Sequence, residues 1–103
     1  MAMVFDVLEE EKQRLLSLKA KYRQRLTELP KGSISRKKRR NREYLYLAYR
    51  ESGKVKFKYI GPVGSEAAQE AEVQVRRRKD LERKLRQVKE NLADVERGLR
   101  GKR

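Results

Sequence analysis

The sequence contains no cysteine and no histidine, and these two absences exclude several kinds of chemistry. Without cysteine the chain forms no disulfide and offers no thiol nucleophile. Without both residue types it lacks the usual ligands of a zinc site. Histidine is also the most common general base. We therefore expect no catalytic residue, no metal site and no cofactor, and we do not expect an enzyme.

Long apolar runs are missing as well. No stretch of the sequence approaches the roughly 20 apolar residues that are needed to span a bilayer. The first twelve residues, MAMVFDVLEEEK, lack the basic start and the apolar centre of a signal peptide. These absences predict a cytoplasmic protein without a membrane partner, which would be nucleoid-associated if its source is bacterial or archaeal.

Basic residues, in contrast, are in large excess. The 103 residues include 29 Lys and Arg against 15 Asp and Glu, which gives a formal net charge of +14. Only 37% of the residues are hydrophobic, so a large self-contained core is not expected. Like charges at this density repel each other unless a polyanion neutralises them. Nucleic acid is the first candidate for that polyanion, and an anionic membrane surface is the second.

The excess charge is concentrated in the middle third of the chain. Between the two prolines, residues 31–61 hold eleven basic and two acidic residues. Residues 1–30 hold six basic and five acidic residues, and residues 62–103 hold twelve and eight. This distribution indicates flanks that fold and a middle segment that binds.

Both flanks have the spacing of helices. Residues 6–29 begin with Asp6 and Glu9, which resemble a capping box, and their apolar residues recur in steps of three and four. Residues 65–99 begin at Ser65, a plausible N-cap, and their second half contains a heptad seam. The seam consists of Leu81, Leu85, Val88, Leu92, Val95 and Leu99.

We expect the two helices to form an antiparallel coiled-coil hairpin with the middle segment at its tip. If Leu29 lies near Ser65, then Leu15 lies near residues 79–81, and the last turns of the second helix extend past the start of the first. That overhang predicts a homodimer through the six seam residues. The alternative is a frayed C-terminal end, since Gly98 and Gly101 weaken the helix there.

The middle segment predicts three antiparallel strands. Residues 33–38 precede REYLYLAYR and KVKFKYIG, which alternate at period two and are joined by Glu51-Ser52-Gly53. We predict a three-residue loop, because a two-residue Ser-Gly loop would scatter charge over both faces. The register of the first strand stays open, and Ile34 joins the apolar face only if the loop to Glu43 has an even number of residues. The predicted apolar face consists of Leu45, Leu47, Tyr49, Val55, Phe57 and Tyr59. The predicted polar face consists of Tyr44, Tyr46, Ala48, Arg50, Lys54, Lys56 and Lys58.

The predicted polar face has the chemistry of a nucleic-acid-binding surface. Lysine and arginine neutralise phosphates and release counterions, and tyrosine stacks on bases or donates to phosphates. A solvated face whose lysines protect an edge strand is the alternative. The predicted binding residues are Arg36, Lys37, Lys38, Arg39, Arg40, Arg42, Tyr44, Tyr46, Arg50, Lys54, Lys56 and Lys58.

The segment from Gly32 to Pro62, GSISRKKRRNREYLYLAYRESGKVKFKYIGP, resembles the small three-stranded DNA-binding domains at the N-termini of tyrosine-type integrases and certain transposases. The shared pattern is a Gly-Ser-Ile start, a basic run, an aromatic strand, a Tyr-Arg-x-x-Gly-Lys turn and a third strand that leads into a helix. The segment is also similar to short uncharacterised basic proteins of bacteria and archaea. The resemblance implies a sheet that enters the major groove and brings to DNA the side chains of Arg36, Lys38, Arg42, Tyr44, Tyr46, Lys54 and Lys56. It does not carry over recombinase activity, because the chain lacks the catalytic domain and adds a helix before the sheet.

The sequence therefore predicts an α+β fold in a single domain over residues 1–103, with a helix over 6–29, a basic sheet over 33–61 and a long helix over 65–99. The predicted function is binding of nucleic acid, with DNA preferred over RNA and double-stranded DNA as the target. The biological role would be regulation of transcription or an accessory function for a mobile element or virus. Two alternatives stay open: an RNA-binding component of a ribonucleoprotein, and a coiled-coil adaptor or holdase whose charge only maintains solubility.

Overall fold

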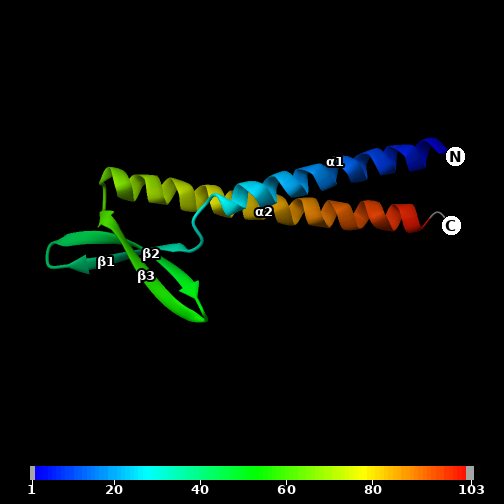
Figure 1. The fold of residues 1–103 in the computed structure, drawn as a ribbon. Helices are drawn as coiled ribbons and strands as arrows, with labels where there is room; N and C mark the ends of the chain where they lie inside the picture. The colour runs from blue at the N-terminus through cyan, green and yellow to red at the C-terminus, as the bar shows by residue number, and fades with distance from the viewer. Residues whose placement is uncertain (1, 102–103) are drawn as a thin grey trace. The chain divides into compact units, whose positions relative to one another are not determined.

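The computed structural model describes residues 2–101 and contains two helices and one sheet (Figure 1). In chain order the elements are α1 (Ala2–Thr27), β1 (Ser33–Arg39), β2 (Arg42–Glu51), β3 (Lys54–Pro62) and α2 (Glu66–Arg100). This arrangement confirms the predicted fold class, an α+β protein with a three-stranded antiparallel sheet between an N-terminal helix and a long C-terminal helix. Helix α1 begins four residues earlier than predicted, at Ala2 instead of Asp6.

The chain divides into two compact units. The helical unit consists of residues 2–28 and 80–101, and the sheet unit consists of residues 29–79. Helix α2 contributes to both, since its first fourteen residues, 66–79, belong to the sheet unit.

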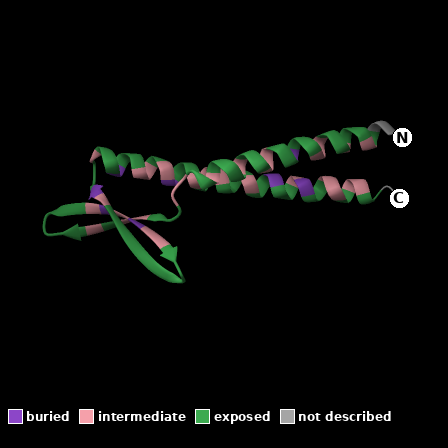
Figure 2. Cartoon of the chain, in the orientation of Figure 1, coloured by how far each residue is buried: buried purple, intermediate pink, exposed green. Residues whose placement is uncertain are grey.

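The helical unit is an antiparallel hairpin of α1 and the later part of α2. Its core is formed by Leu15, which is 1% exposed, together with Val88 and Leu92. Figure 2 colours the few buried positions of the chain purple. Leu18, Tyr22 and Val95 are partly buried against this cluster. Burial of one leucine side chain contributes about 1.5–3 kcal/mol, so these few residues supply much of the stability of the hairpin.

The pairing of the two helices differs from the prediction. Leu15 packs against Val88 and Leu92 instead of residues 79–81, which is a shift of about two to three turns. At the far end, a Cβ atom on Gly98 would lie 3.4 Å from Leu8. The predicted overhang at the C-terminal end of α2 is therefore wrong, because α1 extends alongside it.

The cause of the shift lies at the other end of α2. Leu29 does not lie near Ser65, because its carbonyl accepts a 3.0 Å hydrogen bond from the guanidinium of Arg78. The preceding turns of α2 instead pack in the sheet unit, where Ala68 and Val75 are buried. Only the residues from Asp80 onward are left to pair with α1.

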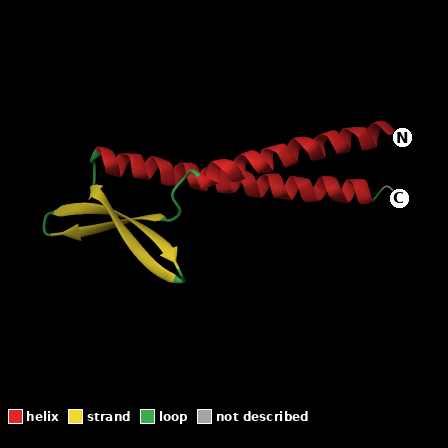
Figure 3. Ribbon diagram, viewed as in Figure 1, coloured by secondary structure: helices red, strands yellow, loops and turns green. Residues whose placement is uncertain are grey.

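The sheet has the order β1-β2-β3 (Figure 3), and the registers leave two residues in each connecting loop. Between β2 and β3, Glu51 lies opposite Lys54, and Ser52 and Gly53 have φ values of 53° and 77°. Two consecutive residues with positive φ are characteristic of the hairpin turn whose twist matches that of the flanking strands. The predicted three-residue loop is therefore wrong.

The shorter loop exchanges the two faces of β3 relative to β2. Tyr49 lies opposite Lys56, and Ala48 lies opposite Phe57. Because side chains directly opposite each other point to the same side of a sheet, the apolar residues of β3 share a face with Tyr44 and Tyr46. The predicted segregation of apolar and basic side chains onto separate faces is wrong. The prediction assumed that the apolar residues of both strands are buried together, but Phe57 and Tyr59 are about half exposed.

A β-bulge near the end of β3 changes the pairing between β2 and β3 by one residue. Tyr46 lies opposite Tyr59, but Leu45 lies opposite Gly61, so Ile60 is the extra residue. The bulge places the buried Gly61 beside Leu45, where a Cβ atom would lie 3.0 Å from the hydroxyl of Ser65. Glycine therefore lets the end of β3 approach the start of α2 closely.

One face of the sheet is turned toward α2 around Leu45 and Leu47, and we call it the covered face, although the lysines that β3 contributes to it are exposed. Leu45 and Leu47 are buried on it, and Ile34 lies opposite Leu47, since the loop between β1 and β2 has an even number of residues. An ion pair of 3.5 Å joins Arg36 to Glu72 of α2. The covered face consists of Ile34, Arg36, Lys38, Glu43, Leu45, Leu47, Tyr49, Glu51, Lys54, Lys56, Lys58 and Gly61.

Candidate nucleic-acid interface

The opposite side of the sheet, which we call the open face, combines aromatic and basic side chains. It consists of Ser33, Ser35, Lys37, Arg39, Arg42, Tyr44, Tyr46, Ala48, Arg50, Val55, Phe57, Tyr59 and Pro62. Val55, Phe57 and Tyr59 are 53%, 49% and 52% exposed. A cluster of large apolar side chains left this exposed is a common sign of an interaction surface.

The aromatic rings of the open face contact one another. The centroid of the Tyr59 ring lies 5.4 Å from that of Tyr46, with an angle of 65° between the planes. It lies 6.2 Å from that of Tyr44, with an angle of 51°. Tilted pairs at these distances are favourable, and they hold the rings in place while part of each ring remains accessible to solvent.

Lys37 lies over two of these rings. Its ammonium nitrogen is 3.8 Å from the centroid of Phe57 and 5.0 Å from the centroid of Tyr46. At an exposed site a cation–π contact contributes about 0.5–1 kcal/mol. The contact is weak enough to be replaced when the ring or the ammonium group gains a stronger partner.

Two arginines and three tyrosines surround an open depression of about 410 Å³ near the β1–β2 loop. Arg40, in that loop, has a φ of 58°, and Arg39 precedes it at the end of β1. The tyrosines are Tyr44, Tyr46 and Tyr59. Guanidinium groups bind phosphate oxygens, and the rings offer flat apolar surfaces, so the depression suits a group that is both planar and anionic.

The structure separates the twelve residues that the sequence predicts for binding. Lys37, Arg39, Arg42, Tyr44, Tyr46 and Arg50 lie on the open face, and Arg40 lies in the adjoining loop. Arg36, Lys38, Lys54, Lys56 and Lys58 lie on the covered face, away from Tyr44 and Tyr46. The expectation that Lys54, Lys56 and Lys58 share a face with these tyrosines is therefore wrong. Lys56 instead lies 3.4 Å from the carboxylate of Glu51.

The prediction did not assign Val55, Phe57 and Tyr59 to the binding surface. Two features of the sequence point to their position. Ser-Gly between strands fits a two-residue turn, and it places Glu51 opposite Lys54, a pair of opposite charges. Gly61 within a strand is also a known sign of a bulge or of a close backbone approach.

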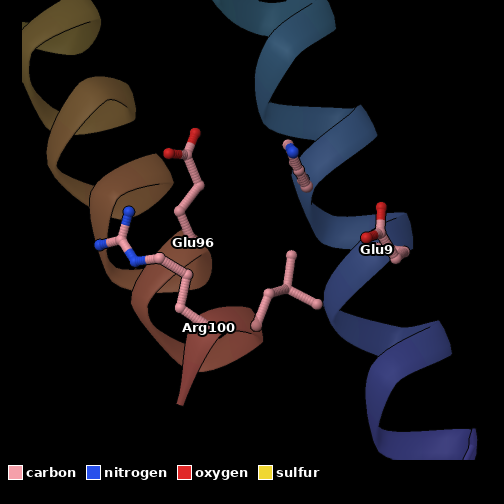
Figure 4. A pocket seen from close by; sticks show the side chains of 5 residues that line it. Glu9, Glu96 and Arg100 are labelled. Atoms are coloured by element: carbon pink, nitrogen blue, oxygen red, sulfur yellow. The ribbon is translucent and has the colours of Figure 1, made fainter. Parts of the chain in front are cut away.

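The helical unit contains a second hollow, of about 270 Å³. Glu9 and Lys12 of α1 line it together with Glu96, Leu99 and Arg100 of α2, and Figure 4 shows Glu96 and Arg100 across from Glu9. Acidic and basic groups are mixed in this hollow, so it has no preference for a polyanion.

Within residues 2–101 no group of three or more potential metal-binding side chains is present. Neither helix of that range is long and apolar enough to cross a membrane.

A family model with the description "Domain of unknown function (DUF6788)" matches residues 4–70. The chain belongs to this family. The DUF6788 match includes α1 from Val4 onward, all three strands and both loops of the sheet, and therefore the complete open face. It ends in the first turns of α2, so the part of α2 that pairs with α1 lies outside it. No curated protein and no solved structure matches the chain significantly.

Proposed function

We propose that this protein binds nucleic acid and that the open face is its contact surface. The observation that carries the proposal is the gathering of cations around exposed aromatic rings on the one face of the sheet that α2 does not cover. Lys37, Arg39, Arg42 and Arg50 lie on that face, and Arg40 lies in the adjoining loop. A chain of net charge +14 attracts any polyanion, and this face adds groups that suit phosphates and bases in particular.

The proposed nucleic acid is DNA in preference to RNA. This preference rests on the resemblance of residues 32–62 to integrase-type domains, and it would place the protein in the cytoplasm, at the nucleoid of a prokaryotic cell. Regulation of transcription, or an accessory role for a mobile element or virus, would follow from it. An RNA-binding role is the alternative that competition between matched DNA and RNA distinguishes.

The proposal is tested by two variants of equal charge. Arg39→Glu with Arg42→Glu changes the open face, and Lys54→Glu with Lys58→Glu changes the covered face. Each pair lowers the formal net charge from +14 by four. Arg39 and Arg42 lie opposite each other, so their replacement exchanges one pair of like charges for another. Circular dichroism checks that both variants fold.

We expect the open-face variant to bind mixed-sequence DNA at least about 10-fold more weakly than the wild type. The plot of log K against log salt should become shallower by about 1.4–1.8, because two phosphate contacts are lost. The covered-face variant should lose much less. Equal losses would mean that binding follows net charge alone and that the open face is not the contact surface. If the wild-type protein shows no salt-dependent binding to DNA or RNA, the proposed function is wrong and an adaptor or holdase becomes the better explanation.

We separately propose a homodimer through the second half of α2, which no longer rests on an overhang but on seam leucines that the chain itself leaves partly exposed. Val88 and Leu92 of the predicted contact are already buried against Leu15 within the chain, whereas Leu81, Leu85 and Leu99 are only partly buried. We expect sedimentation equilibrium at micromolar concentration to give twice the chain mass of 12.3 kDa, and Leu99→Glu to shift the distribution toward monomer. A mass of one chain across the concentration range would contradict the dimer.

A further inference from the structure

We infer that the open face binds single-stranded nucleic acid and that unpaired bases stack on the rings of Tyr46, Phe57 and Tyr59. This inference rests on the proposed function and specifies the form of the polymer. Its starting point is the two-residue turn at Ser52 and Gly53, which places Phe57 and Tyr59 beside Tyr44 and Tyr46.

Exposure favours an unpaired base as the partner of these rings. Phe57 and Tyr59 are 49% and 52% exposed, and the covered face, not this one, carries the buried side chains Leu45 and Leu47. Every base has a flat π surface that is free only when the base is unpaired and unstacked. Stacking on the rings removes the apolar surface of both partners from water.

A duplex uses this surface poorly. Its bases present only their edges in the grooves, and these edges are recognised mainly by hydrogen-bonding side chains. Val55 and Phe57, which β3 contributes to the open face, have no hydrogen-bonding group. The lysines of β3, which suit the duplex backbone, point to the covered face. The observed register therefore favours the single strand over the duplex that the sequence predicts.

The depression at the β1–β2 loop provides a position for one nucleotide. Tyr44, Tyr46 and Tyr59 form its aromatic side, and Arg39 and Arg40 form its cationic side. A base that lies against the rings brings its own phosphate within reach of the two guanidinium groups. Arginine also stacks on bases, so both groups contribute to the same nucleotide.

Next to this depression, Lys37 covers the ring of Phe57 and changes its contacts when a base binds there. In the free protein its ammonium group lies 3.8 Å from the centroid of Phe57 and covers that ring. A base that stacks on Phe57 must displace the ammonium group, which then pairs with a phosphate of the same strand. The lysine thus exchanges a weak contact for a charge-assisted one at the moment of binding.

The tested ligands are fluorescently labelled oligothymidine of about 15 nucleotides, a length within the range of single-strand sites, and a DNA duplex of the same length. Anisotropy titrations use the wild type, Phe57→Leu with Tyr59→Leu, and the control Tyr49→Leu. The double variant keeps apolar side chains but removes two rings from the open face. The control removes one ring from the covered face.

We expect the wild type to bind oligothymidine more tightly than the duplex, and the double variant to bind it at least about 10-fold more weakly. The salt dependence of binding by the double variant should match that of the wild type, because the removed rings carry no charge. Tyr49→Leu should bind like the wild type. Stacking should also quench the tyrosine emission of the wild-type protein, since four of its five tyrosines lie in the sheet.

Other results separate the two proposals. Tighter binding to the duplex, or an unchanged affinity of the double variant for oligothymidine, would overturn the stacking inference and leave the electrostatic proposal standing. Binding of polyglutamate as tight as that of oligothymidine would also overturn it, because a polypeptide offers charge without planar bases. Absence of binding at low salt to either DNA and to RNA of the same length would overturn both.

Discussion

Replacement of Gly32 with alanine is expected to destabilise the sheet unit by about 3–5 kcal/mol. Gly32 has a φ of 128°, which a residue with a side chain rarely adopts. A Cβ atom at this position would overlap the carbonyl oxygen of Ala48 and would lie 3.2 Å from the Cβ of Tyr49. Both contacts are to β2, so the backbone of the central strand or the start of β1 must move. This loss is a large part of the total stability of a small protein, which is about 5–15 kcal/mol.

Gly53→Ala is the matched control. Gly53 also has a positive φ, of 77°, but a Cβ atom there would meet no other atom within 4 Å. We expect a loss of about 1–2 kcal/mol, from backbone strain alone. Urea unfolding followed by tyrosine emission reports mainly on the sheet, which holds Tyr44, Tyr46, Tyr49 and Tyr59. Equal losses for the two variants would show that the close approach of Gly32 to β2 contributes nothing.

Leu45→Ala is expected to destabilise the sheet unit by about 2–5 kcal/mol. Leu45 is 0% exposed and lies on the central strand β2, between Arg36 of β1 and Gly61 of β3. Its truncation leaves a cavity on the covered face, where few other apolar side chains are available to fill it. Tyr44 and Tyr46 are its neighbours in the chain and point to the open face, so the variant also tests whether binding depends on the packing beneath the rings.

Val55→Ala on the same sheet serves as the comparison, since Val55 is 53% exposed and leaves no cavity. We expect it to change the free energy of unfolding by less than about 0.5 kcal/mol. Both variants are measured by urea unfolding and by oligothymidine binding. If Leu45→Ala were as stable as Val55→Ala, the burial of Leu45 would not hold the sheet together.

The helices and strands could be predicted from the sequence because their signals are local. Apolar steps of three and four define α1 and α2, and period-two alternation defines β2 and β3. The pairing of the helices is not a local property. The heptad seam indicates which side of α2 is apolar, but it does not determine which heptad packs against Leu15. That choice depends on the sheet unit, which takes the turns of α2 that contain Ala68 and Val75.

The candidate site was only partly predictable, for a related reason. The basic residues around Arg40 and the tyrosines of β2 follow from composition and alternation. Which side chains of β3 lie on the open face depends on the length of the loop before it. A change of one residue in that loop turns every side chain of β3 to the opposite face. The assumption that all apolar side chains are buried together selected the wrong length, because it treats Phe57 and Tyr59 as core residues. A functional surface departs from that assumption by leaving apolar rings in water.

The open face also raises the question of how such a surface avoids pairing with a second copy of itself. Exposed rings on a sheet favour self-association, which depletes the free protein. Two copies placed face to face, however, would bring Lys37, Arg39, Arg42 and Arg50 of each chain against the same cations of the other. Mutual repulsion opposes this contact, whereas a polyanion cancels it. The cations thus disfavour self-association and leave the exposed rings free to contact a ligand of opposite charge.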